Sequence, residues 1–534
     1  MTVETVDGVP TAPRFDPAAM RVAHIAQANA VSSASDGDLW PSAWATDGNL
    51  YAACGDGTGF SRHGWSDIVM NRIVGTPETG FTGRRLASGD QIAPQWRPSL
   101  YSRKPTGMAC VRSHGRDVLF LAVQYLRSTP GADMFNEAPA ATIVRSDDLG
   151  HTWRWPPDPV FDDHVFTTVM FLDLGQANGG ADWLYAYGID GNWRTSYSKI
   201  VPDPTALYLG RVRPELAQDK ASWEFYVGSG AEGTPRWTSS IGNKRPVLTD
   251  DRRFYPVVPP GDVGNGTCIA QGSVVWNPGL KCYLYSTWSE YTIELFGAAA
   301  PWGPWLHILS RDFGHYPWRG PNDPLAKHGG YATTIPSKFI SADGTLMWLQ
   351  SNWFVGASTR GGRAYCFGLR PVCLNPGTSM EAPSVGNLAM EGAWPVVSRL
   401  RDGQEFAISD GTRLYGDDTA HGPGFGADRW GYTWAAPRRM ASLVFSHGGQ
   451  DSTGGWFEDG PQLEIRRYGH WSGATGVRIA PMYPHDSTSL ERDRYVVTFD
   501  PVTADGICLV GTPGGVGRYT SMSEIEVWGP DQSP

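Results

Sequence analysis

Short apolar runs alternate with polar turns along most of the chain, a pattern that is typical of β-strands and not of helices. The clearest case is residues 36–60, where two apolar, aromatic-rich runs flank the turn Thr46-Asp47-Gly48-Asn49. Because Asp-Gly is a strong hairpin signal, these runs are expected to pair antiparallel. The start of the first run and the end of the second then lie at one edge, which brings Asp38 and Asp56 together. The alternative is that both are ordinary turn residues, since Asp is common beside Gly in loops.

The same hairpin pattern recurs four more times before residue 375. The further turns lie at 113–117, 175–180, 277–279 and 341–344. Most copies are followed by another strand-like run, and a hairpin with outer strands repeated around a circle is typical of a β-propeller. The sequence therefore predicts an all-β protein with a five-bladed β-propeller over residues 30–375, with six blades as the alternative.

Polar residues gather at one end of these hairpins. In a propeller the innermost strands run in one sense, so their beginnings converge on one face around the central channel. The residues expected there are Asp38, Asp56, Lys104, Gln124, His164, Asp190, Gln271, Glu290, Tyr331 and Asn352. Their carboxylates, one lysine and one histidine predict a polar, partly charged pocket. This repeated placement favours a functional role for Asp38 and Asp56.

Neighbours of that face are candidates for substrate binding. The rings that could stack on a sugar, or equally form blade core, are Trp40, Trp44, Phe60, Tyr187 and Trp276. Lys104, His164 and Gln271 are candidates for binding hydroxyl groups. Asp190 or Glu290 could supply the like charge that raises the pKa of an aspartate across the pocket.

Residues 146–153 read Ser-Asp-Asp-Leu-Gly-His-Thr-Trp and match the Asp-box, Ser-x-Asp-x-Gly-x-Thr-Trp. In this hairpin turn the Asp and the Ser bond local backbone, and the Trp packs beneath. The motif is specific for propeller-type folds and lies between the outer strands of a blade. Its role is therefore expected to be structural, away from the catalytic face.

The pattern changes after residue 375. Residues 376–387 form a polar linker with Pro and Gly, and residues 388–534 carry alternating strands whose count suits a β-sandwich. The ending Ser523-Glu524-Ile525-Glu526-Val527-Trp528-Gly529 resembles the last strand of discoidin-like sandwiches, which often bind carbohydrate; a packing domain without a ligand is the alternative. Residues 1–29 are expected to be an N-terminal extension.

Composition narrows the function. The 534 residues include 65 Gly, 41 Pro, 23 Trp and 21 Tyr, which suits many short strands and rings that stack on sugars. A net charge of −10 argues against binding nucleic acid, and no apolar run reaches the roughly 18 residues that cross a bilayer. The 12 His show no pair with ligand spacing, so no metal or cofactor is expected. The start of the chain has neither a basic nor an apolar leader region, so we expect export with the leader missing, and a cytoplasmic protein is the alternative.

Five stretches of the chain resemble the DUF4185 family. They are residues 38–60 (Asp-Leu-Trp-Pro at the start and Gly-Asp-Gly-x-Gly-Phe at the end), Leu207-Tyr208-Leu209-Gly210-Arg211-Val212, Trp223-Glu224-Phe225-Tyr226, Trp276-Asn277-Pro278-Gly279-Leu280 and Ala300-Pro301-Trp302-Gly303-Pro304-Trp305. Members of that family include endo-acting D-arabinanases, glycoside hydrolases that cut the D-arabinofuranose polymers of mycobacterial cell walls. The resemblance implies a five-bladed propeller glycosidase over residues 30–375 that acts on arabinogalactan or lipoarabinomannan. Its essential aspartates would be Asp38 and Asp56.

Glycosidases commonly use one protonated carboxyl to assist the leaving oxygen and one ionised carboxylate as nucleophile or base. Asp38 is assigned here as base or nucleophile and Asp56 as general acid, or the reverse. Two other functions stay open. A sialidase-like hydrolase fits the Asp-box but needs an arginine cluster, and Arg is not prominent on the predicted rim. A non-catalytic glycan-binding protein would keep the aromatic residues without needing both aspartates.

Overall fold

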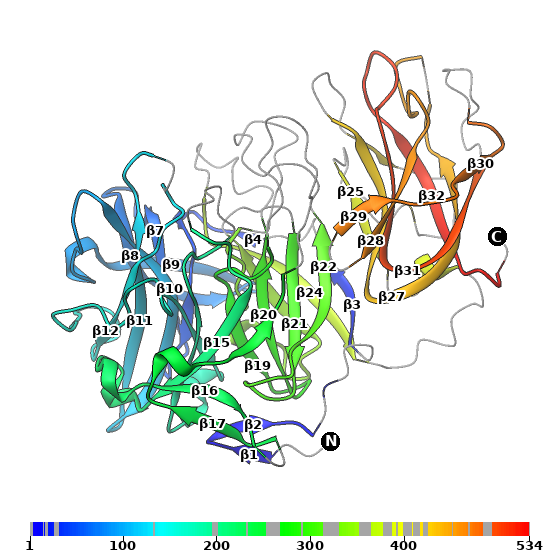
Figure 1. The fold of residues 1–534 in the computed structure, drawn as a ribbon. Coiled ribbons are helices and arrows are strands. Elements are labelled where there is room, and N and C mark those ends of the chain that lie inside the picture. Colours follow the sequence, from blue (N-terminus) through cyan, green and yellow to red (C-terminus); the bar gives the residue numbers. More distant parts are fainter. Residues whose placement is uncertain are drawn as a thin grey trace.

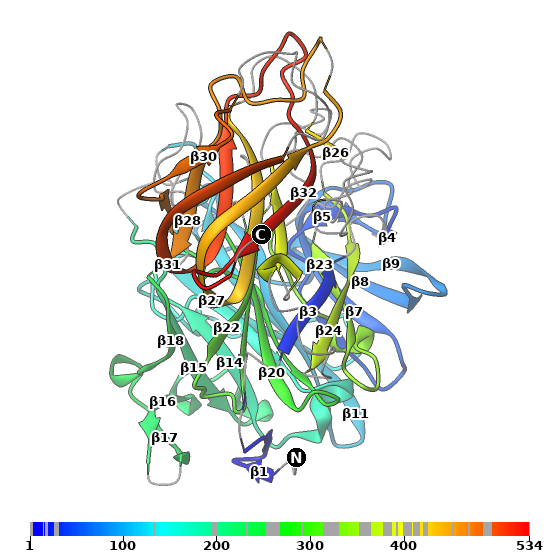
Figure 2. The same ribbon diagram turned by 90° about the vertical axis from the view of Figure 1, so that its right-hand side faces the viewer.

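Strands dominate the computed structural model (Figures 1 and 2), which confirms the predicted all-β class. The structure describes residues 4–13, 15, 20–25, 31–131, 134–194, 201–230, 233–251, 267–289, 292–312, 331–351, 365–376, 387–390, 393–398, 408, 417–419, 426–450, 452–467, 470–483 and 494–532. The helices of these ranges are short 3-10 turns: η2 (Gly89–Gln91), η3 (Gln176–Gly180), η4 (Pro214–Leu216), η5 (Lys220–Ser222), η7 (Ile241–Asn243), η8 (Ser337–Phe339) and η9 (Leu388–Met390). No helix in the described ranges is long and apolar enough to span a membrane.

The first sheet contains the predicted first hairpin. Its strands are β5 (Asp36–Asp38), β6 (Ser42–Trp44), β7 (Leu50–Gly59), β8 (Ser66–Thr76) and β9 (Gly80–Ser88). Asp47 closes the turn between β6 and β7, because its carboxylate accepts hydrogen bonds from the backbone and the side chain of Asn49 at 2.9 and 2.7 Å. Strand β7 pairs antiparallel with both β5 and β6, and Asp38 lies opposite Gly55. The hairpin is therefore confirmed, and it places Asp38 beside Asp56.

The second sheet is an antiparallel meander that carries Lys104. Its strands are β10 (Tyr101–Ser113), β11 (Arg116–Arg127) and β12 (Ala140–Ser146). His114 and Gly115 form the turn between β10 and β11 with φ angles of 47° and 79°, and positive φ at both positions is what a type I′ turn requires. The resulting register pairs Lys104 with Gln124.

The turn that follows β12 is held by its own polar side chains. Ser146 Oγ accepts a hydrogen bond from the backbone N–H of Gly150 at 2.8 Å. The Asp148 carboxylate accepts from the backbone N–H and the hydroxyl of Thr152 at 2.8 and 2.7 Å. Trp153 is buried and donates from Nε1 to the Gly150 carbonyl at 3.1 Å. These bonds hold residues 146–153 together as a turn at the end of β12.

Two further meanders join into one ten-stranded sheet. Its strands are β13 (Thr168–Asp173), β14 (Leu184–Ile189), β15 (Ala206–Val212), β16 (Glu224–Ser229), β17 (Pro235–Thr238), β18 (Pro246–Thr249), β19 (Ser273–Asn277), β20 (Cys282–Trp288), β21 (Thr292–Ala298) and β22 (Leu306–Asp312). The meanders meet where β13 pairs in parallel with β19. Alternate side chains of β14 enter two different apolar cores, Tyr185 and Tyr187 in one and Leu184 in the other. Because both faces are covered, this strand reads as a continuous apolar run in the sequence.

A further sheet combines strands from distant parts of the sequence. Strand β24 (Gly368–Pro376) pairs antiparallel with β23 (Leu346–Ser351), β3 (Met20–Ile25) and β4 (Val31–Ser32). Residues 1–29, expected to be an extension, therefore contribute a strand to this sheet. Ahead of β3, the strands β1 (Glu4–Val6) and β2 (Val9–Thr11) form a separate hairpin.

The C-terminal strands form an eight-stranded sheet around a second apolar core that contains Trp430 and Phe445. They are β25 (Trp394–Val397), β26 (Asp417–Asp418), β27 (Asp428–His447), β28 (Gln462–Arg467), β29 (His470–Gly473), β30 (Arg478–Ala480), β31 (Arg494–Gly511) and β32 (Ser521–Trp528). In Figure 2 the long strands β27, β31 and β32 cross in front. Strand β31 runs unbroken over its 18 residues, and irregularities interrupt its pairing with β27. The described strands of the predicted sandwich are thus joined in one hydrogen-bonded sheet.

The C-terminal sheet packs against β21 and β22. Trp471 shares an apolar cluster with Phe296. Glu294 is fully buried at the same contact, where its carboxylate lies 2.6 Å from His307 Nε2 and 3.8 Å from Arg466 Nη2. The two parts of the chain therefore share both an apolar and a charged contact.

Candidate active site

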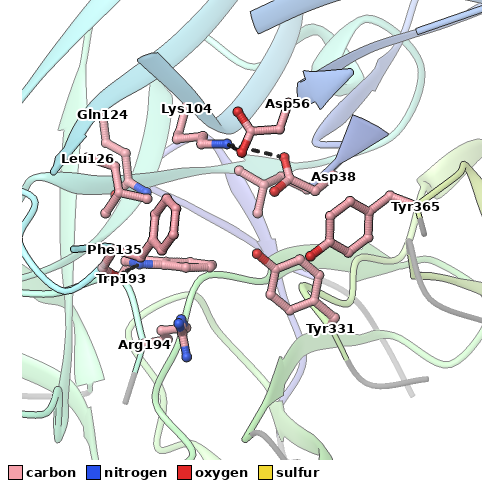
Figure 3. Close-up of a pocket in the computed structure, with 11 residues that line it drawn as sticks. Asp38, Asp56, Lys104, Gln124, Leu126, Phe135, Trp193, Arg194, Tyr331 and Tyr365 are labelled. Atoms are coloured by element: carbon pink, nitrogen blue, oxygen red, sulfur yellow. Dashed lines mark hydrogen bonds and ion pairs between the residues drawn. The ribbon is translucent and has the colours of Figure 1, made fainter. Parts of the chain in front are cut away.

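Three charged side chains from two sheets meet at one point. Asp38 ends β5, Asp56 follows Gly55 in β7, and Lys104 lies in β10. Lys104 Nζ lies 3.7 Å from Asp38 Oδ1 and forms a closer ion pair with Asp56 Oδ2 (Figure 3). The Lys104 side chain is 3% exposed, that of Asp38 6% and that of Asp56 33%. One buried ammonium therefore bridges two carboxylates that differ in their access to water.

The backbone around these three residues is constrained. Leu39 and Asp56 have φ angles of 77° and 43°, in the left-handed region that non-glycine residues seldom adopt. A Cβ atom at Gly55 would lie 2.4 Å from Asp38 Oδ1 and 3.1 Å from Lys104 Cδ, so the close approach of the two side chains requires glycine here. Strained backbone of this kind persists where the surrounding structure enforces it, and it clusters at functional sites.

Burial gives the two carboxyls different chemistry. Loss of water raises the pKa of Asp38 from 3.8 to about 6; the Lys104 charge opposes this shift, and the Asp56 charge adds to it. Burial lowers the pKa of Lys104, but the charges of Asp38 and Asp56 outweigh it, so this pKa lies above its usual value. Lys104 therefore stays positively charged, whereas Asp38 can hold a proton close to neutral pH.

A cavity of about 230 Å³ opens beside these charges. It is lined by Asp38, Leu39, Asp56, Lys104, Gln124, Leu126, Phe135, Trp193, Arg194, Tyr331 and Tyr365. The carboxylates and Lys104 lie on one side of it, and aromatic rings lie across from them (Figure 3). The rings of Tyr331 and Tyr365 are stacked with centroids 5.6 Å apart, and Trp193 meets Tyr331 edge-on at 6.0 Å. Charged groups facing aromatic rings suit a ligand with both hydroxyl groups and apolar ring faces.

The structure brings together half of the residues expected at the rim. Asp38, Asp56, Lys104, Gln124 and Tyr331 all line the cavity. They come from β5, β7, β10, β11 and the segment before β23, so the convergence joins hairpins that are distant in sequence.

Trp40 and Phe60 lie outside the cavity lining. Trp40 is fully buried, and its ring meets Phe60 and Phe367 edge-on with centroids 5.8 and 5.5 Å away. Its Nε1 donates to a backbone carbonyl at 2.7 Å. Of the two roles left open for these rings, core packing fits the full burial of Trp40, whereas Phe60 is half-buried against the same apolar cluster. The other proposed stacking rings also pack against apolar cores: Trp44, Tyr187 and Trp276.

His164 and Asp190 do not line the cavity either. His164 Nε2 lies 3.3 Å from Glu137 Oε1, and Asp190 Oδ2 pairs with Lys244 Nζ at 2.9 Å. The ion pair of Asp190 is made with the lysine of another loop. The expectation that Asp190 adds negative charge at the carboxylate pair therefore has no support in this geometry.

Gln271 donates hydrogen bonds to two segments beside the site. It is buried and donates from Nε2 to the carbonyl of Pro105, the residue after Lys104, at 2.9 Å. Its backbone N–H donates to the carbonyl of Trp193 at 2.6 Å, so Gln271 connects two segments that line the cavity. The expected site residues Glu290 and Asn352 lie outside the described residues.

Several lining residues were not found from the sequence. Phe135, Trp193, Arg194 and Tyr365 lie on connections between strands, where no strand periodicity constrains their direction. Trp193 and Arg194 come shortly after the end of β14, so extending the hairpin-end argument by a few residues would have found them. Phe135 and Tyr365 have no comparable signal.

Lys104 also limits what the site can hold. Its ammonium occupies the position between the carboxylates where a shared cation would bind. Within the ranges that the structure describes, no three His, Cys, Asp or Glu side chains are grouped to hold a metal ion. The residues present therefore offer carboxyl acid–base chemistry next to a fixed cation.

The chain matches no protein-family model and no curated protein, so the resemblance to the DUF4185 family is not confirmed. Solved structures with similarity include a candidate hydrolase from Bacteroides ovatus, at 12% identity and a TM-score of 0.38, over 64% of this chain and 87% of that chain. The family 32 CBM of C. perfringens NanJ, solved with galactose, has 15% identity and a TM-score of 0.21, over 27% of this chain and 98% of that chain. A chitosan-binding module from a Paenibacillus chitosanase/glucanase has 17% identity and a TM-score of 0.21, over 27% of this chain and 98% of its own. At these identities and TM-scores the similarities assign neither a family nor an activity.

Proposed function

We propose that the cavity is the active site of a glycoside hydrolase. The observation that carries this proposal is that two carboxyls reach one cavity in unlike environments. Asp38 is buried with a raised pKa, whereas Asp56 is more exposed and makes the closer ion pair with Lys104. Glycosidases use such a pair, one carboxyl protonated and the other ionised. Asp38 is then the general acid, and Asp56 is the nucleophile or base; of the two assignments left open by the sequence, burial favours this one.

Lys104 keeps the two roles apart. Its ammonium forms the closer ion pair with Asp56, whereas burial raises the pKa of Asp38 to about 6 and lets this carboxyl hold a proton.

The proposed substrate is a polymer of D-arabinofuranose of the mycobacterial type, cut within the chain. Its support is the stretch 38–60, which carries the resemblance to the arabinanase-containing family and whose residues Asp38 and Asp56 both line the cavity. Aromatic rings facing carboxylates also suit a sugar polymer in general.

The proposed scaffold is a five-bladed propeller followed by a discoidin-like domain. Its support is a succession of antiparallel meanders, β5–β9, β10–β12, β13–β18 and β19–β22, followed by the sheet of β23 and β24. The pairing of β3 with β24 would close such a ring between its two ends, since a strand from one end of the chain completes the last sheet.

The test is product analysis on mycobacterial arabinogalactan with wild type, Asp38→Asn and Asp56→Asn. We expect oligosaccharides from wild type and a loss of at least about 10²-fold in either variant, because each role is needed for one bond cleavage. Asp173→Asn is the matched control: this aspartate also has a pKa raised by burial to about 6 but does not line the cavity. Activity surviving in either Asp38→Asn or Asp56→Asn would contradict the assignment. Binding of the polymer without any cleavage would favour a non-catalytic glycan-binding protein.

A further inference from the structure

Phe135 presents an exposed ring to the cavity. It is 37% exposed, whereas the lining residues Trp193 and Tyr331 are buried and Tyr365 is half-buried. In Figure 3 the Phe135 ring lies on the side of the cavity that carries Gln124 and Trp193, across from Asp38. A water-accessible aromatic face beside a pair of carboxyls is placed where it could stack on a sugar ring.

The backbone holds Phe135 in place. Its φ angle is 62°, a left-handed conformation that costs free energy for a bulky residue. Two hydrogen bonds fix that conformation: the Phe135 N–H donates to the Arg127 carbonyl at 2.8 Å, and Trp193 Nε1 donates to the Phe135 carbonyl at 2.9 Å. The loop thus accepts strain and presents an apolar ring to the cavity.

Gln124 adds a polar group on the same side. Its side chain is fully buried, and its Oε1 accepts a hydrogen bond from Thr168 Oγ1 at 2.9 Å, which fixes the orientation of the amide. No described residue accepts a hydrogen bond from its Nε2. A buried donor without a protein partner is costly, so a partner from the cavity would stabilise it. Because Gln124 pairs in register with Lys104, this donor lies next to the carboxylate pair.

We propose that Phe135 and Gln124 form one sugar-binding subsite beside the carboxylates. Phe135 stacks on the C–H face of a sugar ring, and Gln124 Nε2 donates to one of its hydroxyl groups. This inference rests on the proposed glycosidase function and deepens it. The subsite selects neutral rings that present an apolar face opposite a hydroxyl-bearing edge, and it disfavours substrates with a charged group at that face.

The test is the split between KM and kcat on mycobacterial arabinogalactan. Phe135→Ala is expected to raise KM roughly tenfold with kcat within about twofold, and Phe135→Trp, which restores a ring face, is expected to recover most of the loss. Gln124→Met, which removes the donor at similar volume, is expected to raise KM several-fold. Trp155→Ala is the matched control, because that ring is also 37% exposed but does not line the cavity. Circular dichroism and thermal melting establish that each variant is folded.

Affinity electrophoresis in gels that contain the same polymer separates the failure modes. If wild type cuts arabinogalactan and Phe135→Ala has the same KM, the subsite is overturned and the proposed function stands. If the polymer retards wild type more than Phe135→Ala but wild type cuts nothing, the subsite is supported and the hydrolase assignment is overturned. A wild type that neither cuts nor is retarded overturns both.

Discussion

Replacing Asp38 by Asn should change how the stability of the protein depends on pH. The pKa of Asp38 is about 6 in the folded protein, against an ordinary value of 3.8. The folded state therefore binds the proton more tightly than the unfolded chain between these pH values. The stabilisation from this proton is fully present below pH 3.8 and is lost as the pH rises through 6. The asparagine variant has no such proton, so this pH-dependent stabilisation disappears from its unfolding free energy.

The size of the effect follows from the pKa shift. A shift of about two units corresponds to about 3 kcal/mol, of which most falls between about pH 4 and pH 8. Urea unfolding across that range measures it: the free energy of unfolding of wild type minus that of Asp38→Asn should fall by roughly 2–3 kcal/mol from low to high pH. Lys104 stays charged throughout, so it adds no slope of its own.

Asp173→Asn tests whether burial is the cause. Burial raises the pKa of Asp173 to about 6 as well, although the backbone N–H groups of Gly175 and Ser337 donate to its carboxylate. The free energy of unfolding of wild type minus that of Asp173→Asn should also fall as the pH rises, by a similar amount. The activity of Asp173→Asn should stay at the wild-type level. A difference curve for Asp38→Asn that is flat between pH 4 and pH 8 would refute the argument that burial holds a proton on this carboxyl.

Two further predictions concern the neighbours of Asp38. Lys104→Met should move the alkaline limb of the pH profile of kcat/KM to higher pH, because the Lys104 charge lowers the pKa of Asp38 and its removal lets that pKa rise; an unmoved or lowered limb argues against Asp38 as the acid. The same variant should lower kcat, since Asp56 loses its ion pair. Gly55→Ala should lower kcat by about 10²-fold, because the new Cβ would lie 2.4 Å from Asp38 Oδ1 and must displace that carboxyl. Steady-state kinetics measures this loss, with circular dichroism to establish that the variant is folded; a normal kcat would mean that the position of Asp38 does not matter.

Local turn chemistry is what made part of this fold predictable. Asp47 and Gly48 define a hairpin whose register follows from the turn, so the pairing of Asp38 with the strand of Asp56 could be derived from the residues alone. The pairing of β3 with β24 joins segments far apart in the sequence, and no local pattern marks such a contact. Phe135 is unpredictable for another reason. Its direction depends on a positive φ angle and on hydrogen bonds to Arg127 and Trp193, neither of which periodicity encodes.

The sequence left the role of Trp40 open between sugar stacking and core packing, and this ambiguity has a physical cause. An aromatic residue two positions after a candidate catalytic Asp suits both a sugar platform and a core residue. Leu39 and Trp40 have positive φ angles of 77° and 56°, and with this backbone the Trp40 ring is buried. Alternation along a strand cannot anticipate this, because the left-handed residues interrupt the strand between β5 and β6.

The energetics of Asp38, Asp56 and Lys104 argue against the view that the aspartates are ordinary turn residues. A buried ion pair recovers its desolvation cost only with good geometry, and apolar residues of similar volume often serve stability equally well. Here the burial of Asp38 costs enough to raise its pKa to about 6, and the backbone at Leu39 and Asp56 is strained as well. Stability alone would not maintain such a group of charges, and a solvent-exposed turn would not bury Lys104 between two carboxylates. Strained backbone and buried charges that stability does not require are concentrated at the wall of one cavity. Such a concentration is typical of sites where carboxyls carry out acid–base chemistry.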